Sequence, residues 1–297
     1  MSFFGTFFTK DRLASYGGLT VDNNGHSAGL TRGIAGNAIT LQAFNLRNGG
    51  YYQVVATESI GIQATSWGDN GTLEIFAGGT FTASNLTSLS NLTLVNSSTL
   101  GLPSLNTMSA ITFTNNGIYN HSSGTLNINN SSTWYENGSL PAIGNVTPIT
   151  SISVTDATLE FQNQTDVLSA AFNSLTVNNG GIVTHLRNGA VPTAQLNLVL
   201  GSLTVSGNGR IDVSGRGYPP HLGTAGYGPG GGIGFSGGTY GGIGSPQSSN
   251  INTTTYGSIS YPSDHGSSGG TSGAPTVSGA GGGVIRVSVT GTATING

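Results

Sequence analysis

Residues 203–213 read LTVSGNGRIDV, two short runs of alternating apolar and polar residues joined by a Gly-Asn turn. The same layout of strand, small-residue turn and strand occurs at 111–121 (ITFTNNGIYNH) and at 175–185 (LTVNNGGIVTH). Looser copies begin at residues 92, 126 and 152, so that successive copies start 15 to 28 residues apart. Repeated two-strand units with loops of varying length are typical of a solenoid, in which each coil stacks on the one before it.

The alternation within these units predicts which side chains face the core. Leu, Ile, Val and Phe occupy alternate positions between Thr, Ser and Asn, so one face of each strand should be buried and the other hydrated. We therefore predict an all-β fold, a right-handed parallel β-helix (β-solenoid), in which apolar side chains of adjacent coils stack inward. The predicted ladder residues of the two clearest units are Leu175, Val177, Ile182, Leu203, Val205 and Ile211.

An antiparallel β-sandwich is the structural alternative. It would reverse the chain through tight two-residue turns, and the pairs Asn116-Gly117 and Asn179-Gly180 suit such hairpin turns.

The composition excludes several classes of partner. The 297 residues include 8 Lys and Arg against 11 Asp and Glu, so the chain lacks the cationic surface that nucleic acids and anionic membranes attract. No apolar run approaches the roughly 20 residues of a transmembrane helix. The absence of Cys excludes disulfides and thiol chemistry. We expect no nucleic-acid partner, no membrane span and no cofactor.

Three regions differ in composition. Residues 1–70 alternate weakly and are interpreted as a β-rich entry and capping region, residues 71–214 as the β-solenoid, and residues 215–297 as a glycine-rich module that returns to a solenoid strand. The module contains long glycine runs, yet aromatic residues are interleaved and a strand-like run, VIRVSV, follows at 284–289. This pattern indicates an ordered excursion inserted near the C-terminus rather than a flexible linker.

The tyrosines of this module form the predicted binding surface. They should anchor the glycine segments and leave hydroxyl groups for a partner. A nearly uncharged surface rich in Tyr, Ser and Gly suits neutral glycans or other protein surfaces. The predicted binding residues are Tyr218, Tyr227, Tyr240, Tyr256 and Tyr261.

The C-terminal third carries a resemblance to known modules. This part of the chain resembles the glycine-rich modules of large bacterial surface and adhesin-like proteins. The segments that carry the resemblance are the run from Leu203 through Arg216-Gly217-Tyr218, the glycine stretch, Tyr256-Gly257-Ser258 with Pro262-Ser263-Asp264, and 281–287 (GGGVIRV). The resemblance implies an extracellular, non-enzymatic β-solenoid and supplies no catalytic residues. A weaker similarity is to the glycine-rich tips of phage tail-fibre adhesins, which the N-terminal two-thirds of the chain does not match.

Glycan cleavage would require two carboxylates on opposite sides of the glycosidic bond. Glu160 and Asp212 occupy comparable positions in their units and should point outward, and we expect both to be solvated strand residues rather than a catalytic pair. His121 and His185 end matching units, and we expect them at the surface. Asp22-Asn23-Asn24-Gly25 suits an Asx turn better than a Ca²⁺ loop. No metal site is predicted.

Sequons of the type Asn-x-Ser/Thr are concentrated in the solenoid and would carry glycans if the host glycosylates secreted proteins. The candidate acceptors are Asn85, Asn91, Asn96, Asn120, Asn130, Asn137 and Asn163.

The features together indicate an extracellular or cell-surface protein with a structural or adhesive function. We expect it to bind a cell-surface glycan or protein, or to associate with itself, and not to be an enzyme. Two alternatives stay open: a carbohydrate-binding or carbohydrate-cleaving β-helix of the phage receptor-binding type, and a subunit of an extracellular filament, because solenoid ends are open sheet edges.

Overall fold

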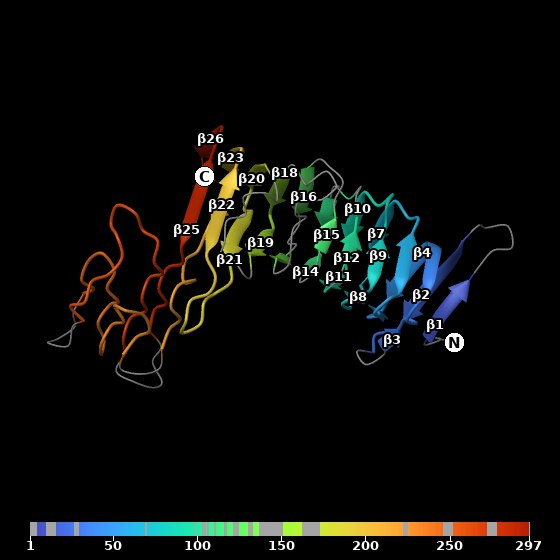
Figure 1. The fold of residues 1–297 in the computed structure, drawn as a ribbon, viewed down its shortest axis with the longest axis horizontal. Coiled ribbons are helices and arrows are strands. Elements are labelled where there is room, and N and C mark those ends of the chain that lie inside the picture. The colour runs from blue at the N-terminus through green and yellow to red at the C-terminus, as the bar shows by residue number, and fades with distance from the viewer. Residues whose placement is uncertain are drawn as a thin grey trace.

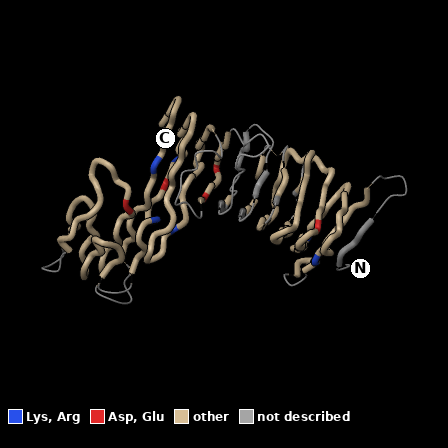
Figure 2. Tube along the Cα trace, viewed as in Figure 1, with Lys and Arg blue, Asp and Glu red and all other residues tan. Residues whose placement is uncertain are grey.

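The computed structural model describes residues 5–9, 16–26, 30–68, 70–97, 99–102, 105, 107–109, 111–115, 118–120, 125–129, 133–136, 151–161, 173–221, 225–245, 252–271 and 278–296. The molecule is an elongated stack of strands, with the N-terminus at one end and the glycine-rich segments at the other (Figure 1). Charged residues are sparse along the trace, and several lie where the solenoid meets the glycine-rich segments (Figure 2).

Three long sheets form the faces of the stack. Sheet A contains, in spatial order, β1 (Gly5–Thr9), β2 (Gly17–Asp22), β4 (Ala38–Arg47), β6 (Ser59–Ile62), β9 (Thr80–Thr82), β12 (Thr99–Gly101) and β15 (Ile118–Asn120). Sheet B contains β3 (Leu30–Arg32), β5 (Tyr51–Val54), β8 (Thr72–Ile75), β11 (Thr93–Asn96), β14 (Thr112–Asn115), β17 (Thr133–Glu136), β19 (Thr158–Phe161), β21 (Ile182–His185) and β24 (Arg210–Ile211). Sheet C contains β7 (Ser66–Gly68), β10 (Ser88–Ser90), β13 (Thr107–Ser109), β16 (Thr125–Asn129), β18 (Ser151–Thr155), β20 (Ser174–Asn178), β23 (Ser202–Ser206) and β26 (Ala293–Asn296). A two-stranded sheet pairs β22 (Leu196–Leu200) with β25 (Ile285–Val289).

The strand pairing confirms the parallel β-solenoid. Among the described strands, β1 and β2 pair antiparallel and every other strand pair is parallel. The antiparallel sandwich is therefore wrong. The reversed β1 lies along the outer edge of sheet A, where it covers backbone groups that another chain would otherwise pair with.

Apolar ladders fill the interior of the coils. Leu175 pairs in register with Leu203, and Val177 with Val205, and all four side chains are buried. These ladder positions are confirmed, and Ile211 packs against the same core.

One predicted ladder residue is wrong. Ile182 pairs with Arg210 on the outer side of sheet B and is half-buried, whereas Val183 is fully buried and pairs with Ile211. Because Ile182 and Val183 are both apolar, the alternation in sequence did not distinguish which of the two faces inward.

Asn-Gly pairs turn the chain at the corners between sheets. Asn179 and Gly180 both have positive φ, 44° and 82°, and the Gly181 amide donates to the Asn178 carbonyl at 2.8 Å. This geometry matches the tight turn of a hairpin, but here the turn connects β20 of sheet C to β21 of sheet B. Gly181 then lies against the preceding coil, since a Cβ atom there would be 2.2 Å from the Val154 carbonyl oxygen. The corner therefore requires glycine.

The glycine-rich module is packed through its backbone. The Gly217 amide donates to the Gly281 carbonyl at 2.9 Å, and the Gly266 amide donates to the Gly282 carbonyl at 2.9 Å. A Cβ atom on Gly281 would lie 1.7 Å from the Gly266 carbonyl oxygen, so these segments approach more closely than larger residues allow. After the module the chain re-enters the solenoid, where β26 pairs with β23.

No helix in the described part of the chain is long and apolar enough to cross a membrane.

Candidate functional site

Glu160 and Asp212 lie in one outward-facing column of sheet B. Glu160 on β19 pairs with Thr184 on β21, and the Asp212 amide donates to the Val183 carbonyl at 2.9 Å, one strand further along. Two strand spacings separate their backbones by about 9.5 Å. The structure thus brings onto one face of sheet B two carboxylates that the sequence could not assign to a common face.

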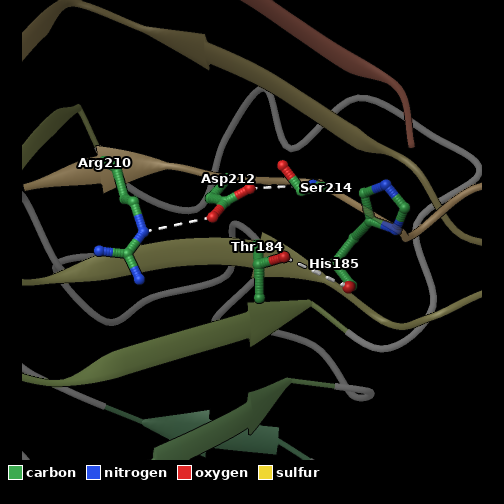
Figure 3. Close-up of polar contacts among 5 residues, drawn as sticks. All are labelled: Thr184, His185, Arg210, Asp212 and Ser214. Carbon is green, nitrogen blue, oxygen red and sulfur yellow. Dashed lines mark hydrogen bonds and ion pairs between the residues drawn. The ribbon is translucent and has the colours of Figure 1, made fainter. Parts of the chain in front are cut away.

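Both carboxylates form polar contacts with neighbouring side chains or backbone groups. Glu160 is 8% exposed and forms an ion pair with Arg216 at 3.1 Å, so the expectation that it is solvated is wrong. Asp212 accepts hydrogen bonds from the Ser214 amide at 2.9 Å and from Arg210 Nε at 3.2 Å (Figure 3). The bonds from Ser214, followed by the Arg210 contribution, lower the pKa of Asp212. A glycosidase needs one protonated carboxyl as general acid, and the lowered pKa makes Asp212 unsuited to that role.

His185 is fully buried, so its predicted surface position is wrong. Its Nδ1 atom donates to the Leu186 carbonyl at 2.8 Å, and burial lowers its pKa to about 4, which keeps the ring neutral. The ring points away from the Arg210–Asp212 pair (Figure 3) and packs edge-on against His265 of the glycine-rich module, with 6.1 Å between centroids. A neutral, enclosed imidazole between module and solenoid fits a packing role.

His121 lies outside the described residues, and so does Asn116-Gly117. Within the described ranges no three His, Asp or Glu side chains gather as metal ligands would. Asp22 forms the Asx turn that its sequence predicts, because its carboxylate accepts from the Asn24 amide at 2.8 Å.

Glu58 is a buried carboxylate that the sequence did not single out. It is 1% exposed and accepts hydrogen bonds from the Tyr52 hydroxyl at 2.9 Å, the Val55 amide at 3.1 Å and the Ile34 amide at 3.3 Å. Gly33 encloses it, since a Cβ atom there would lie 1.6 Å from Glu58 Oε2. These contacts join two neighbouring coils and leave no room for a substrate.

Four of the five predicted binding tyrosines, Tyr218, Tyr227, Tyr240 and Tyr256, are half-buried within the module. The Tyr240 and Tyr256 rings pack at 70° with 5.0 Å between centroids. The Tyr256 hydroxyl donates to the His265 carbonyl at 2.5 Å, and the Tyr240 hydroxyl accepts from the Asp264 amide at 3.3 Å. The expectation that these two hydroxyls are left for a partner is therefore wrong, because they hold the module together.

Tyr261 differs from the other tyrosines. It is 57% exposed whereas the other four are half-buried, and its hydroxyl, like those of Tyr218 and Tyr227, forms no hydrogen bond with the described residues. Of the predicted surface, this ring is the part that a partner could reach most easily.

A groove runs between β25 and the segment 261–264. It consists of two adjoining hollows that share Pro262, Val284 and Ile285 as lining residues. The first, of about 320 Å³, lies between Tyr240, Asp264 and glycine backbone. The second, of about 390 Å³, lies between Tyr261 and the side chains that β22 and β25 present, including Asn197 and Arg286.

The sequence interpretation missed Asn197 and Arg286. Asn197 is 9% exposed, and its side chain forms no hydrogen bond with the described part of the chain. Arg286 lies over the Tyr261 ring, 5.6 Å from its centroid, and has no carboxylate partner among the described residues. A signal for Asn197 was present, because it is the one polar residue within the strand Leu196–Leu200.

The candidate glycosylation sites differ in accessibility. Asn85 and Asn91 are exposed. Asn96 is fully buried in sheet B, so the folded chain does not offer it to a glycosylating enzyme. The side chain of Asn120, and the whole of Asn130, Asn137 and Asn163, lie outside the described residues.

The fold and these surfaces define a parallel β-solenoid with an inserted glycine-rich module and a mixed aromatic and polar groove at their junction. A scan of protein-family models and searches of curated proteins and of solved structures found no match to this chain.

Proposed function

We propose that this protein is a non-catalytic saccharide-binding protein of the extracellular space or cell surface. The β-solenoid acts as an elongated shaft, and the groove beside the glycine-rich module binds a glycan of a cell surface. The proposal extends the resemblance to glycine-rich modules of bacterial surface proteins, whose role is adhesive.

The groove carries this proposal. An exposed ring, Tyr261, lines a hollow of about 390 Å³ together with Asn197, whose amide has no hydrogen-bond partner among the described residues. Sugars are bound by such combinations, since an aromatic ring covers the apolar face of a pyranose while amides and hydroxyls bond its hydroxyl groups. The occupied carboxylates of the Glu160–Asp212 column favour binding without cleavage.

A glycan array followed by isothermal titration calorimetry with the full chain tests the proposal. We expect Tyr261→Ala to weaken binding of the selected glycan by about tenfold, because one lost stacking contact of this kind is worth roughly 1 kcal/mol or more. Tyr16→Ala is the matched control, since Tyr16 is also exposed and directly precedes β2, which lies at the opposite end of the solenoid (Figure 1).

Two results would contradict the proposal. If no glycan binds the wild-type chain, a saccharide is not its ligand, and capture of a protein or of a second copy becomes the function to test. If Tyr261→Ala binds the selected glycan as tightly as the wild type does, the groove is not the site.

A further inference from the structure

The hollow beside β25 contains a cation that no described carboxylate neutralises. Arg286 on β25 is in register with Asn197 on β22. Registered partners in a parallel ladder project to the same face of the sheet, and both side chains line the hollow of about 390 Å³. None of the residues that line this hollow is Asp or Glu.

Three polar groups of the hollow are available to a ligand. Asn197 is 9% exposed, and its amide has no hydrogen-bond partner in the described part of the chain, so a ligand or a water molecule in the hollow can complete its hydrogen bonds. Arg286 is held above the Tyr261 ring, a contact that leaves its N–H groups free to donate. The Tyr261 hydroxyl also has no partner among the described residues.

We infer that this hollow binds a sugar residue that bears a carboxylate, such as a hexuronate unit of an acidic polysaccharide. The inference rests on the proposed function and adds the charge of the ligand. The planar guanidinium of Arg286 matches the two oxygens of a carboxylate, which it binds through paired hydrogen bonds. Asn197 and the Tyr261 hydroxyl suit the ring hydroxyls of the same sugar, and the Tyr261 ring suits its apolar face.

The size and location of the hollow agree with this ligand. A volume of about 390 Å³ falls at the lower end of the range for small-molecule sites, roughly 300–1,000 Å³, and is appropriate for one or two sugar units. The hollow is open at the surface beside exposed Arg286 and Tyr261, so the unit could belong to a longer chain that continues along the groove.

Calorimetry with matched oligosaccharides tests the inference on the full chain. The probes are oligomers of galacturonate, glucuronate and mannuronate, each compared with the neutral oligomer of the same sugar and length. We expect at least one uronate oligomer to bind about tenfold or more tightly than its neutral counterpart, because hydrogen bonds between charged groups are the strong ones. The preference should shrink with added NaCl, since the pair is partly exposed.

Variants of Arg286 show whether this residue causes the preference. Arg286→Gln should bind a uronate oligomer and its neutral counterpart equally, whereas Arg286→Lys should keep part of the preference because the charge remains. Arg187→Gln is the matched control, since Arg187 is exposed and does not line the groove. Circular dichroism establishes that each variant is folded.

The outcomes separate the inference from the proposed function. Equal binding of uronate and neutral oligomers, or a preference that survives in Arg286→Gln, overturns the inference while the proposed function stands. If other glycans bind and Tyr261→Ala weakens that binding, but no uronate oligomer binds, the inference is likewise overturned and the proposed function stands. If no saccharide of any kind binds, both are overturned.

Discussion

Replacing Gly181 with Ala should destabilise the protein even though its backbone conformation favours the substitution. Gly181 does not have a left-handed φ, and at such positions a change from Gly to Ala normally stabilises a protein by about 0.4–1 kcal/mol through the unfolded chain. In this solenoid, however, the new Cβ atom would lie 2.2 Å from the Val154 carbonyl oxygen of the preceding coil.

The size of the effect follows from this contact. Close carbon–oxygen contacts in proteins are about 3.3 Å or longer, so the corner must move by roughly 1 Å against two stacked strands. Overpacking of this kind costs about 1–3 kcal/mol. Subtracting the gain from the unfolded chain leaves a net destabilisation of about 1–2 kcal/mol.

Thermal unfolding followed by circular dichroism measures the change, and Gly189→Ala is the control. A Cβ atom on Gly189 would meet nothing within 4 Å, and its φ is also not left-handed, so that variant should be as stable as the wild type or slightly more stable. For Gly181→Ala we expect a Tm lower by about 2–6 °C. A Tm equal to or above that of the wild type would refute the close stacking of the corners.

Three further predictions concern pH, cleavage and order. The ring of His185 stays neutral in the folded chain down to about pH 4, whereas in the unfolded chain it is protonated below about pH 6.5. The free energy of unfolding should therefore be unaffected by this residue above pH 6.5 and should fall by up to about 3 kcal/mol as the pH drops to 4. Urea unfolding at pH 7 and 4.5 should show this loss in the wild type and a smaller one in His185→Asn, and equal losses would contradict it. The protein should release no sugars from a polysaccharide panel, and release that is abolished by Glu160→Gln or Asp212→Asn would show that the column is catalytic after all. Hydrogen exchange should be slow at the Gly217 and Gly266 amides, which bond across the module, and exchange at random-coil rates there would mean that the module is not packed.

The local structure of the coils could be predicted from the sequence. Each of the six units beginning at residues 92, 111, 126, 152, 175 and 203 contributes two strands to the structure, and the residues that join the strands are described in the units at 152, 175 and 203. The reason is that period-two alternation and Asn-Gly turns depend on neighbouring residues alone. The same local information identified the buried side of most strands, and it failed at Ile182 and Val183, where two apolar residues follow each other.

The location of each unit in the coil was decided by the tertiary structure. The unit at residue 92 runs from sheet B to sheet A through β11 and β12, whereas the similar unit at residue 175 runs from sheet C to sheet B through β20 and β21. The turn Asn179-Gly180 suits a hairpin equally well, and stacking on the preceding coil makes it a corner between parallel strands.

The candidate site depends even more on long-range register. Tyr261 was identified from its surroundings in sequence, but Asn197 and Arg286 meet only because β25 returns to pair with β22 after the glycine-rich module. In the same way, Arg216 pairs with Glu160, which lies far earlier in the chain, so a carboxylate that the sequence alone presented as solvated is bound to a partner. The sequence by itself determined the strands, the turns and the solenoid class, because these follow from local periodicity. The groove and the ion pair of Glu160 with Arg216 required the tertiary structure, because they arise from contacts between residues dozens of positions apart.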